Sequence, residues 1–437
     1  MKVAVLLLLT GALFAGELTL KQAVRDALEN NLELKAYRRQ VKASEYEYKS
    51  VRGLLFPTVK LGETYTKTNI PGYYLVIKMN QERINLPDFN PARLNDPPAI
   101  NNFETKLSIE LPVWMGGKLR AFKNMAKLKW KGDKTNLGRK EEEVVLKVYE
   151  AYANAVLAKA AIEAARQAVK DAEEHVRLAE KAHETGVALF ADVLRARVYL
   201  SKAREKLRQA ENNYRVAKEA LKLVTNKDYG EFEVKSFTGC PELSKERLLK
   251  VALSSREDYA ALNYYVRSLK EGVKSARADY LPKLFAFASW YMYDQDQPFS
   301  NEGDGYMLGL ALTWDFNLGF APLYKAKSFK EQELALRRRR ELLAKAIKFQ
   351  IEEAFAAYQN ALASYESAKA RLEEAKEVVR VMKKRYEEGM ARMVDLLDAQ
   401  TQLDMARFEL VQALKACNVA YAKALFSAGV LKEEVLK

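Results

Sequence analysis

Residues 389–399 read GMARMVDLLDA, and residues 186–196 read GVALFADVLRA, which is nearly the same phrase. In both, a glycine is followed by five residues, an aspartate, an aliphatic residue, a leucine, any residue and an alanine. A phrase that recurs 203 residues later in one chain indicates two copies of one structural unit. The chain is therefore predicted to contain an internal two-fold repeat.

A second region of similarity extends the repeat. Residues 18–36, LTLKQAVRDALENNLELKA, align without gaps with residues 243–261, LSKERLLKVALSSREDYAA. The offset is 225 residues here and 203 residues near the glycines, so the first copy contains an insertion of 22 residues. The insertion fits residues 69–102, a polar stretch with five prolines that predicts a long loop.

Long intervals of the chain lack helix-breaking residues. None of the eleven prolines lies between Pro112 and Pro241, and none follows Pro322. These intervals are rich in Ala, Glu, Lys, Leu and Arg, a composition typical of very long helices or coiled coils. Residues 118–184 are predicted to form one helix, about 100 Å long at 1.5 Å per residue.

Between the helices, each copy changes to an alternation of apolar and polar residues. Residues 103–113, FETKLSIELPV, and residues 306–317 both alternate in this way. Alternation predicts strands with one apolar face, here of roughly 9 to 12 residues, the length of a tilted strand that crosses a bilayer. Pro57 and Pro282 mark the helix-to-strand junctions, and each copy is expected to form one strand hairpin. Aromatic residues near the strand ends would form an interfacial girdle: Tyr65, Trp114, Trp290, Tyr291, Tyr293, Tyr306 and Trp314.

Four strands cannot close a barrel, and an open sheet edge in lipid leaves backbone amides without partners. The chain is therefore expected to self-associate. Two protomers would give eight strands, and three would give twelve strands around an aqueous bore. A soluble four-stranded sheet is the alternative, but the flanking helices are too long to supply a compact second layer.

The N-terminus indicates export. Residues 1–16, MKVAVLLLLTGALFAG, have one lysine followed by an apolar run that is too short to span a bilayer, which predicts a secretory signal peptide. After export, Cys240 and Cys417 could form a disulfide or remain as two shielded thiols.

Several function classes are disfavoured. The net charge of +14 could indicate nucleic acid binding, but the 72 basic residues are interleaved with 58 acidic ones, which is typical of ion-paired helix faces. There is no nucleophile triad, phosphate loop or zinc spacing, so neither catalysis nor a cofactor is expected. The only histidines, His175 and His183, lie on charged helix and do not indicate a metal site.

The order of these features resembles the TolC-type outer-membrane efflux proteins, the outer membrane factors of tripartite efflux and type I secretion systems. The resemblance extends over essentially the whole chain after the signal. It depends on LTLKQAVRDALENNLELKA, on LLFPTVKL and YLPKLFAF, on LPVWMGGKLRA, and on the pair ETGVALFADVL and EEGMARMVDLLDA.

The resemblance implies an α+β membrane protein that forms a homotrimer. Its twelve-stranded transmembrane β-barrel, with four strands per protomer, would continue into a long α-helical coiled-coil barrel. The protein would lie in the outer membrane of a Gram-negative-type bacterium, with a large periplasmic portion. It would act as a passive duct for drugs, metal ions or secreted proteins, with a periplasmic adaptor and an inner-membrane transporter as partners. A periplasmic coiled-coil adaptor or scaffold without a pore is the alternative.

The repeat and the resemblance together predict the organisation of the chain. A signal peptide (1–16) precedes the first repeat (17–225), with a helix (19–55), a strand hairpin (57–114), a long helix (118–184), a tip (185–191) and a return helix (192–225). A linker (226–242) leads to the second repeat (243–437), with a helix (244–280), a strand hairpin (282–316), a long helix (322–387), a tip (388–394) and a return helix (395–428).

Asp395 and Asp398 lie one helical turn apart on the same face. In the family that the chain resembles, two aspartates of this segment line the closed periplasmic entrance. Threefold symmetry would bring six carboxylates to this pore constriction. Such a ring concentrates cations, and mutual repulsion should raise the pKa of some of its members.

The same resemblance suggests how the entrance is held shut. Asp192 and Tyr386 occupy the positions of the closed-state latch. The arginine that pairs with the first-copy aspartate in the best-known member is Ala391 here, and Arg392 is the adjacent candidate. Gly186 and Gly389 are predicted to form tight turns with positive φ at the tip, where an adaptor would make contact.

Overall fold

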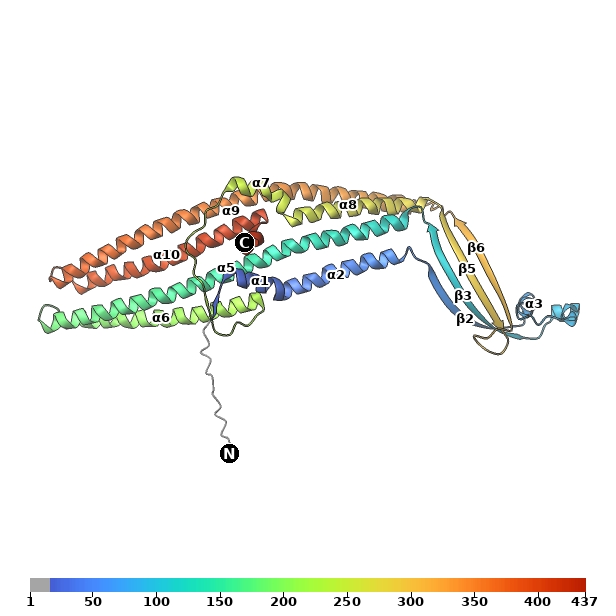
Figure 1. The fold of residues 1–437 in the computed structure, drawn as a ribbon, viewed down its shortest axis with the longest axis horizontal. Coiled ribbons are helices and arrows are strands. Elements are labelled where there is room, and N and C mark those ends of the chain that lie inside the picture. The colour runs from blue at the N-terminus through green and yellow to red at the C-terminus, as the bar shows by residue number, and fades with distance from the viewer. Residues whose placement is uncertain (1–15) are drawn as a thin grey trace, which may run out of the picture. The chain divides into compact units, whose positions relative to one another are not determined.

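The computed structural model describes residues 16–437 (Figure 1). The predicted signal peptide lies outside the described residues except for Gly16. The described chain forms two compact units. Unit 1 contains residues 16–40, 134–261 and 340–437, and unit 2 contains residues 41–133 and 262–339. Each unit therefore takes segments from both sequence repeats. Among the described residues, no helix is long and apolar enough to cross a membrane.

Unit 2 contains a four-stranded antiparallel sheet in the order β2-β3-β5-β6 (Figure 1). The strands are β2 (Thr58–Thr68), β3 (Ile100–Trp114), β5 (Lys283–Asp294) and β6 (Gly303–Thr313). β2 and β3 form one hairpin, β5 and β6 form another, and β3 pairs with β5 to join them. β2 and β6 are consequently the two edge strands, and each is 11 residues long.

The register of the sheet gives it one apolar face. Val59 pairs with Ile109, Ile109 pairs with Ala288, and Ala288 pairs with Leu308, so these four residues lie in one row across the sheet. Leu308 is 69% exposed, and its neighbours on the same face of β6 are also exposed. Met307 lies on the opposite face and pairs with Ser289. The alternation in the sequence therefore places exposed aliphatic side chains on one face of the sheet.

The segment between β2 and β3 differs from the prediction. A long loop was expected, but the segment contains helices α3 (Pro71–Asn80) and α4 (Pro91–Asn95) with a 3-10 turn (Leu86–Phe89) between them. Pro71 and Pro91 occupy the first helical position, where proline stabilises a helix start. The fully buried Asp88 accepts a hydrogen bond of 2.7 Å from Lys78 Nζ, so this segment has a packed interior of its own.

The helices next to the strands are also shorter than predicted. The segment 19–55 consists of α1 (Leu20–Asn30) and α2 (Leu32–Gly53), and the segment 244–280 consists of α7 (Lys245–Ser255), α8 (Glu257–Arg277) and a 3-10 turn (Ala278–Tyr280). The breaks fall at Asn31 and Arg256, which are equivalent positions of the repeat. The Asn31 side chain donates to the Val224 carbonyl (2.7 Å), and the Arg256 guanidinium donates to the Ser427 carbonyl (2.8 Å). Each side chain thus ties a helix break to a distant segment.

Unit 1 contains most of two helical hairpins, whose long helices begin in unit 2 at residues 118–133 and 321–339. The first is formed by α5 (Lys118–Glu184) and α6 (Phe190–Thr225), and the second by α9 (Ala321–Glu387) and α10 (Met393–Ala428), as Figure 1 shows. α5 and α9 are continuous helices of 67 residues each. A short helix, α11 (Leu431–Leu436), ends the described chain. The largest core of unit 1 includes the fully buried Leu34, Tyr152, Leu221 and Ile351.

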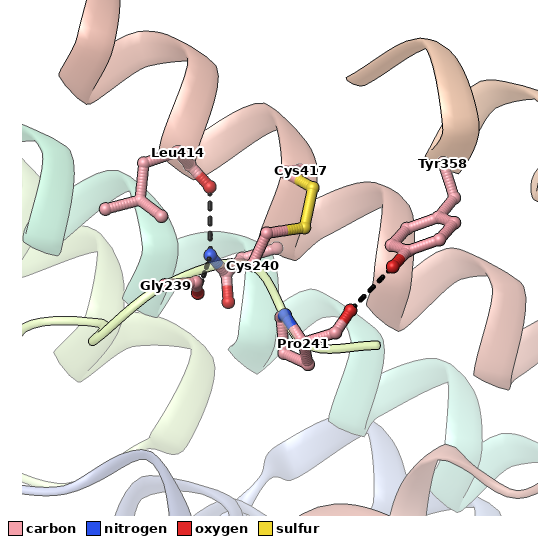
Figure 2. Close-up of a disulfide and its surroundings, with 7 residues drawn as sticks. Gly239, Cys240, Pro241, Tyr358, Leu414 and Cys417 are labelled. Carbon is pink, nitrogen blue, oxygen red and sulfur yellow. Dashed lines mark hydrogen bonds between the residues drawn. A yellow bond between two sulfur atoms is a disulfide. The ribbon is translucent and has the colours of Figure 1, made fainter. Parts of the chain in front are cut away.

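The linker between the repeats is fixed against unit 1 at several points. β4 (Phe232–Val234) pairs in parallel with β1 (Gly16–Leu18). Cys240 forms a disulfide with Cys417 of α10 (Figure 2). Of the two alternatives that the sequence left open, a disulfide or two thiols, the structure has the disulfide. On either side of Cys240, Asn418 Nδ2 donates to the Gly239 carbonyl (3.1 Å) and the Tyr358 hydroxyl donates to the Pro241 carbonyl (2.7 Å).

Candidate functional site: the tip of the helical hairpins

The two hairpin turns of unit 1 have the same geometry. Gly186 and Gly389 both have φ of 74°, the left-handed region that favours glycine. The Gly186 amide donates to the His183 carbonyl and the Val187 amide donates to the Ala182 carbonyl, at 3.0 and 2.9 Å. Equivalent bonds form around Gly389. This pair of backbone bonds closes the C-terminal end of a helix and allows the chain to reverse.

Several apolar side chains at these turns are exposed. Val187 is 65% exposed, Leu189 is 74% exposed and Met390 is 66% exposed. Phe190 is also exposed, although its ring lies 5.6 Å from that of His183. The tip therefore presents an apolar surface to its surroundings.

Immediately behind the turns, the two hairpins share one core. Its buried members come from all four helices: Ala179 of α5, Val193 and Ala196 of α6, Tyr386 of α9, and Met393, Leu396 and Leu397 of α10. Met393 and Leu396 are fully buried, and each lies next to a residue of the predicted site. Packing of this core therefore fixes the start of α10.

The structure places Asp395 and Asp398 on the first two turns of α10 in different surroundings. Asp395, in the first turn of α10, accepts hydrogen bonds from the Arg392 backbone amide (3.1 Å) and from Arg392 Nη2 (3.0 Å). These hydrogen bonds lower the pKa of the Asp395 carboxyl within the single chain, whereas the ring prediction concerned repulsion between chains. Asp398 is exposed and has no hydrogen-bond or ion-pair partner among residues 16–437.

The predicted latch residues are only partly brought together. The Tyr386 side chain is buried, and its hydroxyl has no partner within the described chain. Burial raises the pKa of Tyr386, and the nearby charge of Asp192 acts in the same direction. Asp192 forms an ion pair with Arg195 (3.5 Å), and Arg392 pairs with Asp395 instead. Within one chain, then, Asp192 lies near Tyr386, but Arg392 does not pair with Asp192.

A polar network that the sequence analysis missed lies next to this tip. Its centre is Gln400, whose side chain is 1% exposed. Gln400 Oε1 lies 3.1 Å from His175 Nε2, and Gln400 Nε2 donates to both Asp171 and Asp404 at 3.1 Å. His175 is also buried, and its Nδ1 atom has no partner among the described residues. The network thus joins α5 of the first hairpin to α10 of the second.

Arg407 and Tyr199 complete the network. Arg407 Nη1 donates to Asp171 (2.7 Å) and to Asp404 (3.2 Å), so one guanidinium joins carboxylates of two helices. The Tyr199 hydroxyl of α6 donates to Asp404 (2.6 Å). Burial, together with the Asp404 charge, raises the pKa of Tyr199. One cation therefore lies between two carboxylates in a largely buried place, where removing it is costly.

The residue equivalent to Arg407 in the first copy of the repeat has different surroundings. This residue, Arg204, pairs with Glu173 at 2.9 Å on the surface, where the two side chains are 58% and 51% exposed. The Arg407 side chain is 19% exposed. Among residues 16–437, no group of three or more His, Cys, Asp or Glu side chains could hold a metal ion.

The described chain combines two long helical hairpins with an open sheet of apolar-faced strands. The sequence matches the family described as "Outer membrane efflux protein" over residues 23–227 and 248–427. The chain belongs to this family, as the sequence resemblance indicated, and the α+β fold class with its internal repeat is confirmed. The family consists of outer-membrane efflux proteins and is not an enzyme class.

Solved structures support the same fold. The chain is similar to CusC, with a TM-score of 0.79 and 15% identity over 95% of this chain and 93% of that chain. It is similar to the outer membrane protein VceC of Vibrio cholerae, with a TM-score of 0.77 and 16% identity over 94% of this chain and 96% of that chain. For the CmeC outer membrane channel of Campylobacter jejuni the values are 0.74 and 18%, over 94% and 86% of the two chains. No curated protein sequence matches the chain.

Proposed function

We propose that the protein is a passive, homotrimeric export duct of the outer membrane. It connects an inner-membrane transporter and a periplasmic adaptor to the exterior. The transporter selects the cargo, which passes through a strand barrel in the membrane and a helical tunnel in the periplasm.

The observation that carries this proposal is the open sheet of unit 2. Its edge strands β2 and β6 are both 11 residues long and are unpaired on their outer sides within the described chain. In a bilayer such edges have to be paired, because lipid offers no hydrogen bonds to backbone amides. Pairing β6 of one copy with β2 of the next, repeated around the axis, gives hydrogen-bond partners to the backbone of both edge strands. Three copies then give twelve strands, enough for an aqueous bore, whereas eight strands are filled by side chains.

The faces of the sheet fit the same arrangement. The row of Val59, Ile109, Ala288 and Leu308 would face lipid. The opposite face of β3 presents Glu104, Lys106, Ser108 and Glu110, which would line water. An apolar outer face and a polar inner face are the pattern of transmembrane barrels.

The tip of the hairpins would be the gated periplasmic end. Asp398, exposed and without a partner among the described residues, would form a ring of carboxylates with its symmetry mates, supported by Asp395. Asp192 and Tyr386 would hold the hairpins in the closed arrangement, and iris-like opening would separate them. The exposed Val187, Leu189 and Met390 would give the adaptor an apolar contact at the turns.

A pair of variants in β6 tests the barrel. Leu308 and Met307 are adjacent, both exposed and on opposite faces of the sheet. A lysine on the lipid face near the bilayer centre costs about 2–4 kcal/mol per copy, whereas a lysine in the bore remains hydrated. We expect Leu308→Lys to abolish recovery of trimers from the outer membrane and Met307→Lys to preserve trimers that conduct in planar bilayers.

Light scattering in detergent gives the mass of the wild-type complex. A wild-type protein that is a monomer in water without detergent would refute the duct. Equal behaviour of the two lysine variants would refute the assignment of the faces.

A further inference from the structure

The net charge of the protein is concentrated in one part of unit 2. Four helical segments adjoin the strands there: residues 41–56, 118–133, 262–280 and 321–339. Together they contain 19 of the 72 basic residues but only 7 of the 58 acidic residues. Their surplus of 12 positive charges compares with a net charge of +14 for the whole chain. We call these four segments the basic collar.

Contacts within unit 2 hold the four segments of the basic collar side by side. Lys129 of α5 forms an ion pair with Glu47 of α2 at 2.9 Å. Lys118 of α5 pairs with Asp279 at the end of α8 at 2.6 Å. Val273 and Ala276 of α8 pack against Ala326 and Phe329 of α9. The positive charges therefore lie on one continuous group of helices.

Most of the basic side chains of the collar are exposed, and several have no carboxylate partner. Arg52, Arg120, Arg277, Lys325 and Lys327 are exposed, and none forms an ion pair within the described chain. Lys325 and Lys327 lie over the rings of Phe329 and Tyr324, at 5.7 and 5.6 Å. With seven acidic residues for nineteen basic ones, the collar cannot neutralise itself.

Exposed aromatic side chains lie where the collar adjoins the apolar sheet. Trp314 continues the face of Leu308 beyond the end of β6, and its indole nitrogen donates to the Tyr280 carbonyl at 3.0 Å. Trp114 ends β3, four residues before the start of α5, and Tyr324 lies in the first turn of α9. All four of these aromatic residues, Trp114, Tyr280, Trp314 and Tyr324, are more than a third exposed. Trp and Tyr collect at the level of lipid headgroups, so the collar would begin at that level.

We propose that the basic collar binds the phosphates of anionic phospholipid headgroups in the periplasmic leaflet of the outer membrane. This inference rests on the proposed function, because it needs the sheet to be inserted in a bilayer. The sequence of apolar strand, aromatic belt and basic helix then matches, layer by layer, the hydrocarbon, the interface and the phosphate plane of a membrane. The surplus charge anchors the depth of the barrel and favours anionic over zwitterionic lipid.

A matched pair of triple variants tests the proposal. The collar variant is Arg120→Gln, Lys325→Gln and Lys327→Gln. The control is Lys202→Gln, Lys206→Gln and Arg208→Gln on α6 in unit 1, which removes the same charge from exposed side chains that also lack ion-pair partners. Trimers in nanodiscs or mixed micelles are titrated with phosphatidylglycerol or phosphatidylcholine, and the bound lipid is measured by native mass spectrometry.

We expect the wild type and the control to prefer phosphatidylglycerol, and the preference to fall as salt rises from about 50 to 300 mM. Each basic residue near an anionic surface strengthens binding to anionic lipid roughly 5-fold. The preference of the collar variant for phosphatidylglycerol should therefore be roughly 100-fold weaker than that of the wild type. An equal preference for both lipids in the wild type, or an unchanged preference in the collar variant, overturns the proposal. So does a collar variant with altered ion selectivity but unchanged lipid preference, because the cations would then face the bore. Mass spectrometry of the same samples reports the trimer, so failure of the duct itself is seen separately.

Discussion

Replacing Arg407 by methionine should loosen the contact between the two helical hairpins. The guanidinium lies between Asp171 of α5 and Asp404 of α10, at 2.7 and 3.2 Å, with 19% of its side chain exposed. Methionine replaces the aliphatic part of the side chain but removes the guanidinium, which leaves two partly buried carboxylates close together. Removing one partner of a buried ion pair costs about 3–5 kcal/mol. We expect about 3 kcal/mol here, because Tyr199 and Gln400 still donate to these carboxylates.

Hydrogen exchange followed by mass spectrometry measures the effect. A loss of about 3 kcal/mol in local stability corresponds to roughly 100-fold faster amide exchange in residues 168–180 and 398–410. The matched control is Arg204→Met at the equivalent position of the first copy. Its ion pair with Glu173 is on the surface, where such pairs contribute about 0–1 kcal/mol, so exchange should rise less than about 5-fold. Equal exchange in the two variants, or no change in Arg407→Met, would refute the argument that burial of the network sets its strength.

The remaining predictions concern the disulfide, the proposed carboxylate ring and one of the hairpin turns. Replacing Cys240 and Cys417 by serine should lower the thermal stability of unit 1 under oxidising conditions, by up to about 5 kcal/mol, because the bond closes a loop of 177 residues. The wild type with reductant should behave like the double variant, and a melting temperature insensitive to both changes would contradict this. Asp398→Asn should reduce cation selectivity in planar bilayers without changing stability, since Asp398 has no partner in the described chain; unchanged permeability ratios would exclude the ring. Gly389→Val should destabilise the tip by about 1–2 kcal/mol, because valine avoids a φ of 74°, and circular dichroism melts that match the wild type would contradict this.

The sequence was sufficient for the fold class because its signals are local or periodic. The repeated glycine phrase identified two copies, and the intervals without proline are occupied by α5 and α9. The alternation in residues 103–113 placed the apolar face of β3. These features need only neighbouring residues, so one sequence is enough to read them.

Features that depend on distant partners were missed. The helix breaks at Asn31 and Arg256 are stabilised by carbonyls of Val224 and Ser427, more than 170 positions away in the chain. Gln400 meets Asp171 across 229 positions. No periodicity encodes such contacts.

One part of the site could have been read locally. Arg392 and Asp395 are three residues apart at the start of a helix, a spacing that lets a first-turn carboxylate accept from the backbone amide three residues earlier, and in the structure Asp395 does so. The resemblance directed attention to Asp192 as the partner of Arg392 instead. A helix-start signal in the sequence itself was therefore the better guide to this pair.

The unpaired edges of the sheet also make assembly of newly made chains compete with their aggregation. Until β2 and β6 pair with strands of other copies, each copy exposes two edge strands with unpaired amides and carbonyls. It also exposes the apolar face of the sheet to any other polypeptide nearby. Assembly of the oligomer requires identical copies in one place. Aggregation through the edge strands can occur with almost any extended chain. A cell that makes this protein faster than it can be inserted should therefore accumulate insoluble material, and the yield of usable conduits should peak at a moderate rate of synthesis.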